Sequence, residues 1–192
     1  MDLMKWIIAQ HRGVRAAFNM TVSSMVTPDQ MKERPGGEGN SIAWVMWHMA
    51  RTEDVIINAM ILGEPQLLDS GGWSAKIGID DQRIGTGFDD NEVEDFCRVV
   101  DVKTLDLYWQ AVAESTTTWL KSIDPARLDE KPDADAVAAA LPEGTFGPNN
   151  AGLQVWAGSS AGRLVGGPII SHGYMHVGEM TTIRSRLGAR GI

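Results

Sequence analysis

Residues 41–62 read SIAWVMWHMARTEDVIINAMIL, and this stretch decides the fold. Asn40 or Ser41 is a favourable N-cap, and Gly63 is typical of a helix end. Apolar side chains cover most of the circumference of the helix that the pattern predicts over 42–62. A helix of this kind buries most of its surface, so we expect it to be the central helix of a bundle.

Three other segments carry apolar residues at helical spacing. They are residues 2–25, residues 91–122 with a break near 101–104, and a last segment from the Gly167-Pro168 pair to Leu187. Proline is favoured at the first position of a helix, so we expect the last helix to begin there. Four amphipathic helices around one core predict an all-α fold, a four-helix bundle.

The segments between these helices are long. Residues 64–90 are rich in Gly, Asp and Ser, and we expect a loop with a short helical turn at 73–77. Residues 124–167 are ambiguous, with an Ala-rich helix expected at 133–141. The bundle should therefore have long loops between helices 2 and 3 and between helices 3 and 4, and we expect residues 1–192 to form a single domain.

Charge and cysteine content exclude several classes of protein. The net charge is -8 and no run of Lys or Arg occurs, which argues against nucleic acid and anionic membranes as partners. Cys97 is the only cysteine, so a disulfide within the chain is impossible, and we expect a buried structural thiol. The N-terminus lacks a signal-peptide pattern and no apolar stretch is long enough to span a membrane, so we expect a cytoplasmic protein.

Three of the four histidines fall inside apolar helical patterns. His172 and His176 stand at i, i+4, which places both side chains on one helix face, about 6 Å apart at Cβ. Two such imidazoles can reach one metal ion at about 2.1 Å each. His48 occupies a core position of the second helix. From the residues alone, a shared metal site and individually hydrogen-bonded core histidines are both open, whereas His11 is expected at the surface or rim with no role.

Two charged residues close to these histidines have alternative interpretations. Glu179 follows His176 by three residues and could orient that imidazole or act as a catalytic proton acceptor. The alternative is a solvated glutamate or an ion pair with Arg184. Arg51 could bind a substrate carboxylate, but a surface ion pair with one of the neighbouring acids is the more conservative interpretation.

The histidine-bearing segments resemble a known family. Residues 40–54, NSIAWVMWHMARTED, resemble the second-helix motif of the DinB-like (YfiT-like) superfamily, in which a histidine follows an S-I-x-W-x-x-W run. Residues 171–180, SHGYMHVGEM, resemble its final helix with H-x-x-x-H, and residues 72–79, GWSAKIGI, resemble its loop after helix two. The resemblance implies a four-helix bundle, frequent homodimers and one divalent metal ion of the zinc, nickel or iron type.

Carried onto this chain, the resemblance implies the metal ligands His48, His172 and His176. Some members of the family are thiol-dependent, namely mycothiol-dependent maleylpyruvate isomerases and bacillithiol S-transferases. We therefore expect a metal-dependent enzyme that acts on a small-molecule substrate, with a low-molecular-weight thiol as cosubstrate. Two alternatives stay open: a hydrolase that uses metal-bound water with Glu179 as base, and a non-enzymatic metal-binding stress protein.

Overall fold

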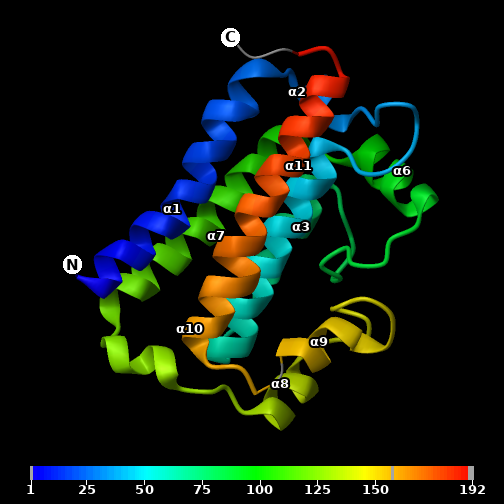
Figure 1. The fold of residues 1–192 in the computed structure, drawn as a ribbon. Helices are drawn as coiled ribbons and strands as arrows, with labels where there is room; N and C mark the ends of the chain where they lie inside the picture. The colour runs from blue at the N-terminus through cyan, green and yellow to red at the C-terminus, as the bar shows by residue number, and fades with distance from the viewer. Residues whose placement is uncertain (1, 157, 190–192) are drawn as a thin grey trace.

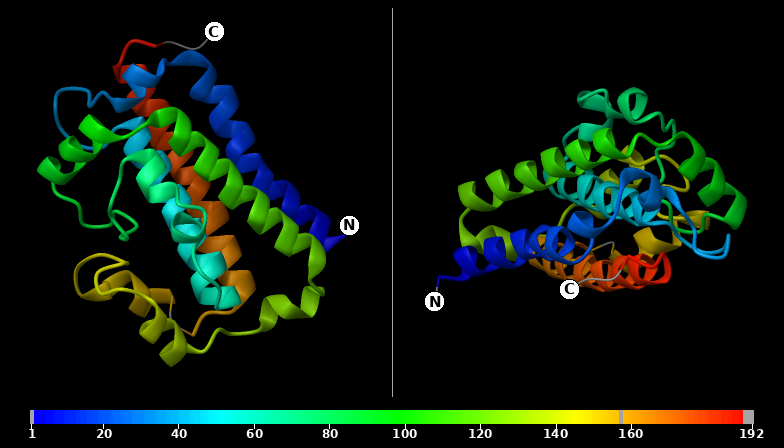
Figure 2. Two further views of the ribbon diagram at one scale, coloured as in Figure 1. Left: turned by 180° about the vertical axis from the view of Figure 1, so that it is seen from behind. Right: turned by 90° about the horizontal axis from the view of Figure 1, so that it is seen from above.

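The computed structural model describes residues 2–156 and 158–189, and within them the chain is helical with no strand. Four long helices lie alongside one another and form the bundle (Figures 1 and 2). These helices are α1 (Leu3–Thr21), α3 (Ile42–Asp54), α7 (Val102–Ser122) and α11 (His172–Arg186). The predicted all-α fold is confirmed.

Helix α3 is the central helix, as its composition predicts. All thirteen of its residues are buried. Its N-terminus is capped by Ser41, whose hydroxyl oxygen accepts a hydrogen bond from the backbone N–H of Trp44 over 3.0 Å. The buried thiol of Cys97 donates to the same hydroxyl oxygen over 3.1 Å, and burial raises the pKa of this thiol. Cys97 is thus packed into the core as expected.

The helix that bears His48 and the helix that bears His172 and His176 each include a π-helical stretch. The second helix continues past α3 as η2 (Val55–Leu62), and α11 is preceded by α10 (Ala161–Leu164) and η5 (Val165–Ser171). The last helix therefore begins at Ala161, and the prediction that it begins at Pro168 was wrong. A proline inside an α-helix lacks an N–H and collides with the carbonyl one turn earlier. The wider π-helical turn relieves that collision, so the helix runs through the proline.

All three connections between the long helices contain short helices. Between α1 and α3 lie η1 (Ser23–Met25) and α2 (Pro28–Lys32). The long connection that follows η2 contains α4 (Leu67–Ser70) and α5 (Trp73–Ile77), and α6 (Asp90–Val99) precedes α7. The chain between α7 and α10 contains η3 (Pro125–Asp129), α8 (Ala134–Ala140), η4 (Pro148–Asn150) and α9 (Ala151–Trp156). The predicted long loops are therefore present.

The two long connections meet on one side of the bundle (Figure 1). The backbone N–H of Ile84 donates to the carbonyl oxygen of Thr145 over 3.0 Å. Pro148 lies so close to Gly87 that a Cβ at Gly87 would approach it to 2.7 Å. These contacts join residues 84–87 of one connection to residues 145–148 of the other. Across the described residues, no helix has the combined length and apolar character that crossing a bilayer requires.

Candidate metal centre

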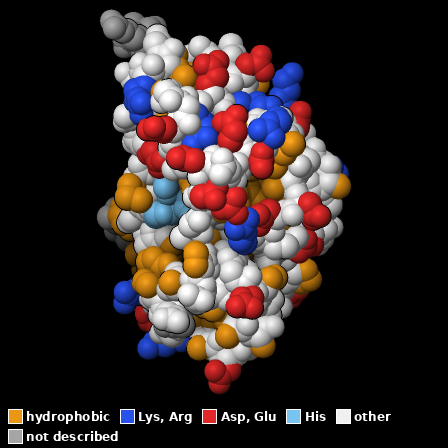
Figure 3. Space-filling view, turned by 90° about the vertical axis from the view of Figure 1, so that its right-hand side faces the viewer, with side chains coloured by type: hydrophobic (Ala, Val, Ile, Leu, Met, Phe, Trp, Pro, Cys, Tyr) orange, Lys and Arg blue, Asp and Glu red, His pale blue; other side chains and the backbone are white. Residues whose placement is uncertain are grey.

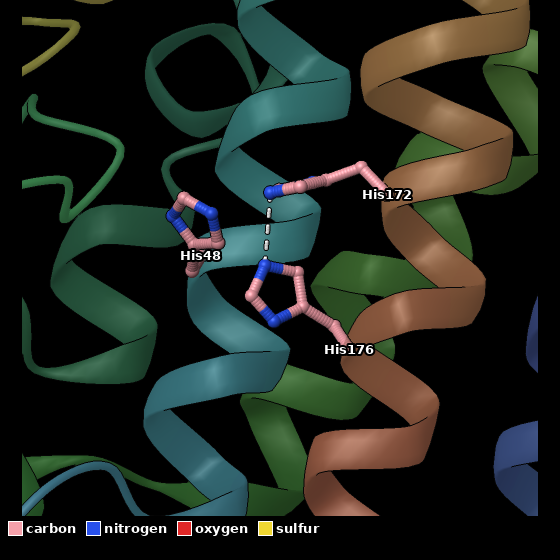
Figure 4. A group of neighbouring side chains, drawn as sticks. All are labelled: His48, His172 and His176. Carbon is pink, nitrogen blue, oxygen red and sulfur yellow. Dashed lines mark hydrogen bonds between the residues drawn. The ribbon is translucent and has the colours of Figure 1, made fainter.

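Helices α3 and α11 bring three imidazoles together. One ring nitrogen from each of His48, His172 and His176 lies within 4.8 Å of the other two. The rings point toward one another from the two facing helices (Figure 4), with centroid separations of 4.2 Å, 4.9 Å and 5.2 Å. His172 and His176 project from one face of α11, as their spacing predicts. His48 comes from a segment more than a hundred residues earlier in the chain.

Hydrogen bonds on the outer side of two rings fix where their protons lie. The Nδ1 of His48 is 2.7 Å from the carbonyl oxygen of Ile84, and the Nδ1 of His176 is 2.6 Å from a carboxylate oxygen of Glu179. A carbonyl and a carboxylate can only accept, so both Nδ1 atoms carry the proton. Both Nε2 atoms therefore keep a lone pair, and that of His176 accepts a hydrogen bond from Nε2 of His172.

The separation of the two ligand atoms on α11 suits a common metal ion. Nε2 of His172 and Nε2 of His176 are 2.9 Å apart. Two nitrogens that each lie 2.1 Å from an ion and subtend a right angle would be about 3.0 Å apart. Three imidazole nitrogens are a donor set that fits zinc, nickel or iron and leaves coordination positions open. The residues present thus fit the metal that the resemblance implies.

Burial keeps His48 and His172 neutral at physiological pH. It lowers the pKa of His48 to about 3, and the proximity of His176 and His172 adds to this effect. It also lowers the pKa of His172 to about 4, again with a contribution from His176. A neutral imidazole is the form that binds a metal, so neither His48 nor His172 has to lose its charge at pH 7.

Glu179 contacts the site through both carboxylate oxygens. Oε2 accepts from Nδ1 of His176, and Oε1 accepts from the side-chain amide of Asn40 over 2.8 Å. The hydrogen bond from His176 is the main reason why the pKa of Glu179 is lowered. The ion pair with Arg184 does not form, because Arg184 donates to the carbonyl oxygen of Thr21 instead. The side chain is placed to hold the ring of His176 in one orientation.

The site has an aromatic wall and reaches the surface. Trp44 stacks on His48 with ring centroids 5.4 Å apart and an angle of 2° between the planes. Gly85 packs against Trp44, so closely that a Cβ there would lie 3.0 Å from its indole. His172 is partly exposed. Figure 3 shows histidine atoms at the surface, with acidic side chains on one side and hydrophobic ones on the other.

The prediction for His11 was wrong. The side chain is only 4% exposed, and its Nε2 lies 2.7 Å from a carboxylate oxygen of Glu53 on α3. The sequence carried a signal for this burial, because Val14 and Phe18 follow at helical spacing and are buried with it. The polar neighbours of His11 in the sequence concealed that signal.

The prediction for Arg51 was correct about its partner and wrong about its exposure. Arg51 forms an ion pair with Asp54 over 3.3 Å, and both side chains are fully buried. A helix with apolar residues around its whole circumference buries the few charged positions it contains as well. Arg51 is therefore not placed to bind a substrate carboxylate.

Comparisons with known proteins agree with this fold. The family model of the DinB superfamily matches residues 10–180. A solved structure described as that of a conserved protein from Enterococcus faecalis is similar with a TM-score of 0.74 and 19% identity, covering 99% of both chains, which shows the fold. No curated protein sequence gives a significant match. Since the family model spans most of the chain, including all three clustered histidines, the protein belongs to the DinB superfamily.

Proposed function

We propose that the protein is a metal-dependent enzyme in which His48, His172 and His176 bind one divalent ion of the zinc, nickel or iron type. The observation that carries this proposal is that the Nδ1 atoms of His48 and His176 already have hydrogen-bond partners in the protein. Ile84 and Glu179 occupy the Nδ1 atoms of His48 and His176, so the Nε2 lone pairs of these two rings are left for the centre of the cluster, where Nε2 of His176 is hydrogen-bonded to Nε2 of His172 over 2.9 Å. Lone pairs that converge in this way repel one another unless a cation or a proton lies between them.

The reaction that we propose is transfer or isomerisation with a low-molecular-weight thiol as cosubstrate. Three protein ligands leave a coordination position for a small molecule, and a thiol bound there loses its proton at neutral pH. Trp44 and the loop around Gly85 form one wall beside this position. The family membership and the thiol-dependent relatives support the thiol over other ligands.

For Glu179 the geometry supports orientation more strongly than catalysis. Both of its oxygens already accept hydrogen bonds, from His176 and Asn40. Acting as a proton acceptor would require it to leave one of them. We therefore propose Glu179 first as the residue that orients His176, and its catalytic role stays a prediction.

Three broader expectations also stay proposals. We propose a single domain over residues 1–192, a cytoplasmic location and a homodimer. The exposed apolar side chains of Leu3 and Trp6 on α1 and of Met175 on α11 support a partner surface on this part of the bundle.

The experiment that tests the function uses cobalt as a spectroscopic substitute for the native metal. The wild-type protein loaded with Co²⁺ is titrated with a panel of low-molecular-weight thiols. We expect a thiolate-to-cobalt charge-transfer absorption, no cobalt signal in His48→Ala, and an unchanged signal in the control Met175→Ala, which alters an exposed residue beside His176. Ester or amide hydrolysis without thiol would favour the hydrolase, and neither signal nor turnover would favour a non-enzymatic protein.

A further inference from the structure

The orientation of His48 depends on a backbone group. Nδ1–H of His48 donates to the carbonyl oxygen of Ile84, which lies in the second connection, between η2 and α7. A hydrogen bond on the outer nitrogen of a metal-binding imidazole fixes the direction of the ring. A backbone carbonyl stays in place only where the chain around it is held. The ring of His48 is therefore as well positioned as Ile84 is.

Ile84 is held by the third connection, which joins α7 to α10. Its backbone N–H donates to the carbonyl oxygen of Thr145 over 3.0 Å, and Thr145 is fully buried. The side chains of Ile84 and Phe146 belong to the same buried hydrophobic cluster. Ile84 thus contacts the third connection through its N–H and its side chain, and it contacts the ligand His48 through its carbonyl oxygen.

Two glycines bring the second and third connections into close contact on one side of the bundle (Figure 1). A Cβ at Gly87 would lie 2.7 Å from Cδ of Pro148, which is shorter than real Cβ contacts are. A Cβ at Gly147 would lie 3.0 Å from the carbonyl oxygen of Thr86, which leaves almost no room for a side chain. The two segments therefore fit each other only because both glycines lack a side chain.

The contacting segment of the third connection is stiffened by its own hydrogen bonds. The carbonyl oxygen of Pro142 accepts from the backbone N–H of Thr145 over 3.2 Å and from its hydroxyl over 2.7 Å. The side-chain oxygen of Asn150 accepts from the backbone N–H of Phe146 over 3.2 Å. Asn149 and Asn150 both have a positive φ, which is uncommon for residues other than glycine. A segment constrained in this way can hold its neighbour in one place.

We propose that the third connection is a positioning element for the metal ligand His48. It fixes Ile84, and the carbonyl oxygen of Ile84 fixes the ring. The proposal rests on the metal centre proposed above and assigns a role to residues 124–167, whose sequence pattern is ambiguous. If the third connection is pushed away, the ring of His48 should lose its outer partner and the metal should bind less tightly.

A pair of matched glycine variants separates this role from general backbone strain. Gly87→Ala introduces the clash with Pro148. Gly144→Ala is the control, because Gly144 has a similar positive φ, 81° against 84°, but a Cβ there would meet no other described residue within 4 Å. The double variant Gly87→Ala/Pro148→Ala removes the proline ring from the clash and serves as the rescue.

Hydrogen exchange followed by NMR in the metal-free protein tests the positioning role directly. In the wild-type protein we expect the amide of Ile84 and Nδ1–H of His48 to exchange slowly with water. Both should exchange faster in Gly87→Ala and at the wild-type rate in Gly144→Ala. If Nδ1–H of His48 keeps its wild-type rate in Gly87→Ala, stacking on Trp44 is enough to hold the ring and the proposal is overturned. A His48 Nδ1–H that exchanges rapidly in the wild-type protein would overturn it as well.

Cobalt affinity gives the functional readout. We expect Gly87→Ala to raise the Kd for Co²⁺ by about 10-fold, because the loss of an outer partner weakens a histidine ligand. Gly144→Ala should leave the Kd unchanged, and the double variant should bind more tightly than Gly87→Ala. An equal rise in both glycine variants, or no rescue by Pro148→Ala, would overturn the proposal. If the wild-type protein binds no Co²⁺, the metal centre fails, and the exchange rates of His48 still decide whether the third connection holds its ring.

Discussion

Helix α3 carries two buried polar clusters, and they differ in how their hydrogen bonds are completed. In the first, the carboxylate of Asp54 accepts from the Tyr108 hydroxyl over 2.6 Å, from the Asn58 side chain over 2.7 Å and from the backbone N–H groups of Leu67 and Leu68 over 2.9 Å. Arg51 completes this cluster. The chain itself supplies the partners of the carboxylate, so the cluster anchors the connection after η2 to the bundle.

The histidine cluster joins α3 to α11, and its hydrogen bonds to the rest of the chain lie on its outer side. His48 and His176 each use Nδ1 for a hydrogen bond to the protein, and one nitrogen of each of the three rings lies within 4.8 Å of the other two. Buried polar groups in folded proteins are almost always paired. We infer that the cluster whose hydrogen bonds the chain completes serves the fold, and we propose that the one in which three imidazoles share a centre serves a ligand.

The largest expected effect is that of Asp54→Asn, which should lower the stability of the fold without changing metal binding. Removing one partner of a buried ion pair costs about 3–5 kcal/mol of unfolding free energy, because Arg51 is left uncompensated. Urea denaturation of the metal-free protein measures this loss. The folded fraction should still bind Co²⁺ with wild-type stoichiometry, and a parallel loss of metal would show that the clusters are not independent.

The converse variant is His48→Ala. A saturating metal that binds only the folded state stabilises it, by about 2.7 kcal/mol at a concentration 100 times the Kd. We expect zinc to raise the melting temperature of the wild-type protein and of Met175→Ala but not that of His48→Ala. Equal stabilisation of all three would contradict the assignment of His48 as a ligand.

Acid should destabilise the metal-free protein through the histidine cluster. Burial lowers the pKa of His48 to about 3 in the folded state, against 6.5 for an unperturbed histidine. Between these values the unfolded chain binds more protons, so the free energy of unfolding falls as the pH falls, by about 1.4 kcal/mol per pH unit below 6.5. His172 acts in the same direction. Urea midpoints between pH 7 and pH 4 should fall less steeply in His48→Ala, and identical slopes would refute this cause.

The smallest effect is expected from Glu179→Gln. The amide can still accept a hydrogen bond from His176 but lacks the negative charge, so the Kd for Co²⁺ should rise by about 10-fold. Because Glu179 is partly exposed, unfolding of the metal-free protein should change little. Isothermal titration of both proteins measures the ratio, and tighter binding by the variant would contradict an orienting role.

The sequence predicted the elements that depend on composition and spacing. The segment 42–62 is apolar around its circumference and so had to be central, and the i, i+4 spacing of His172 and His176 placed them on one face. The sequence could not predict the hydrogen-bond partner of His48, because that partner is a backbone group. The carbonyl oxygen of Ile84 holds His48, yet any residue type offers such a carbonyl.

Two errors have the same physical origin, since tertiary packing overrode a local rule. Pro168 was expected to begin a helix, but a π-helical turn lets the helix begin at Ala161. His11 was expected at the rim because its neighbours are polar, but Glu53 on α3 pairs with it inside the bundle. In both cases the decisive partner or conformation is not encoded in adjacent residues.

Anomalous diffraction from crystals of the zinc-loaded protein, combined with elemental analysis, tests the proposed metal centre itself. We expect about one ion per chain and a single anomalous peak roughly 2.1 Å from Nε2 of His48, His172 and His176. A fully loaded sample whose anomalous peak lies elsewhere, or a chain that retains no zinc while these rings are hydrogen-bonded to one another, would contradict it.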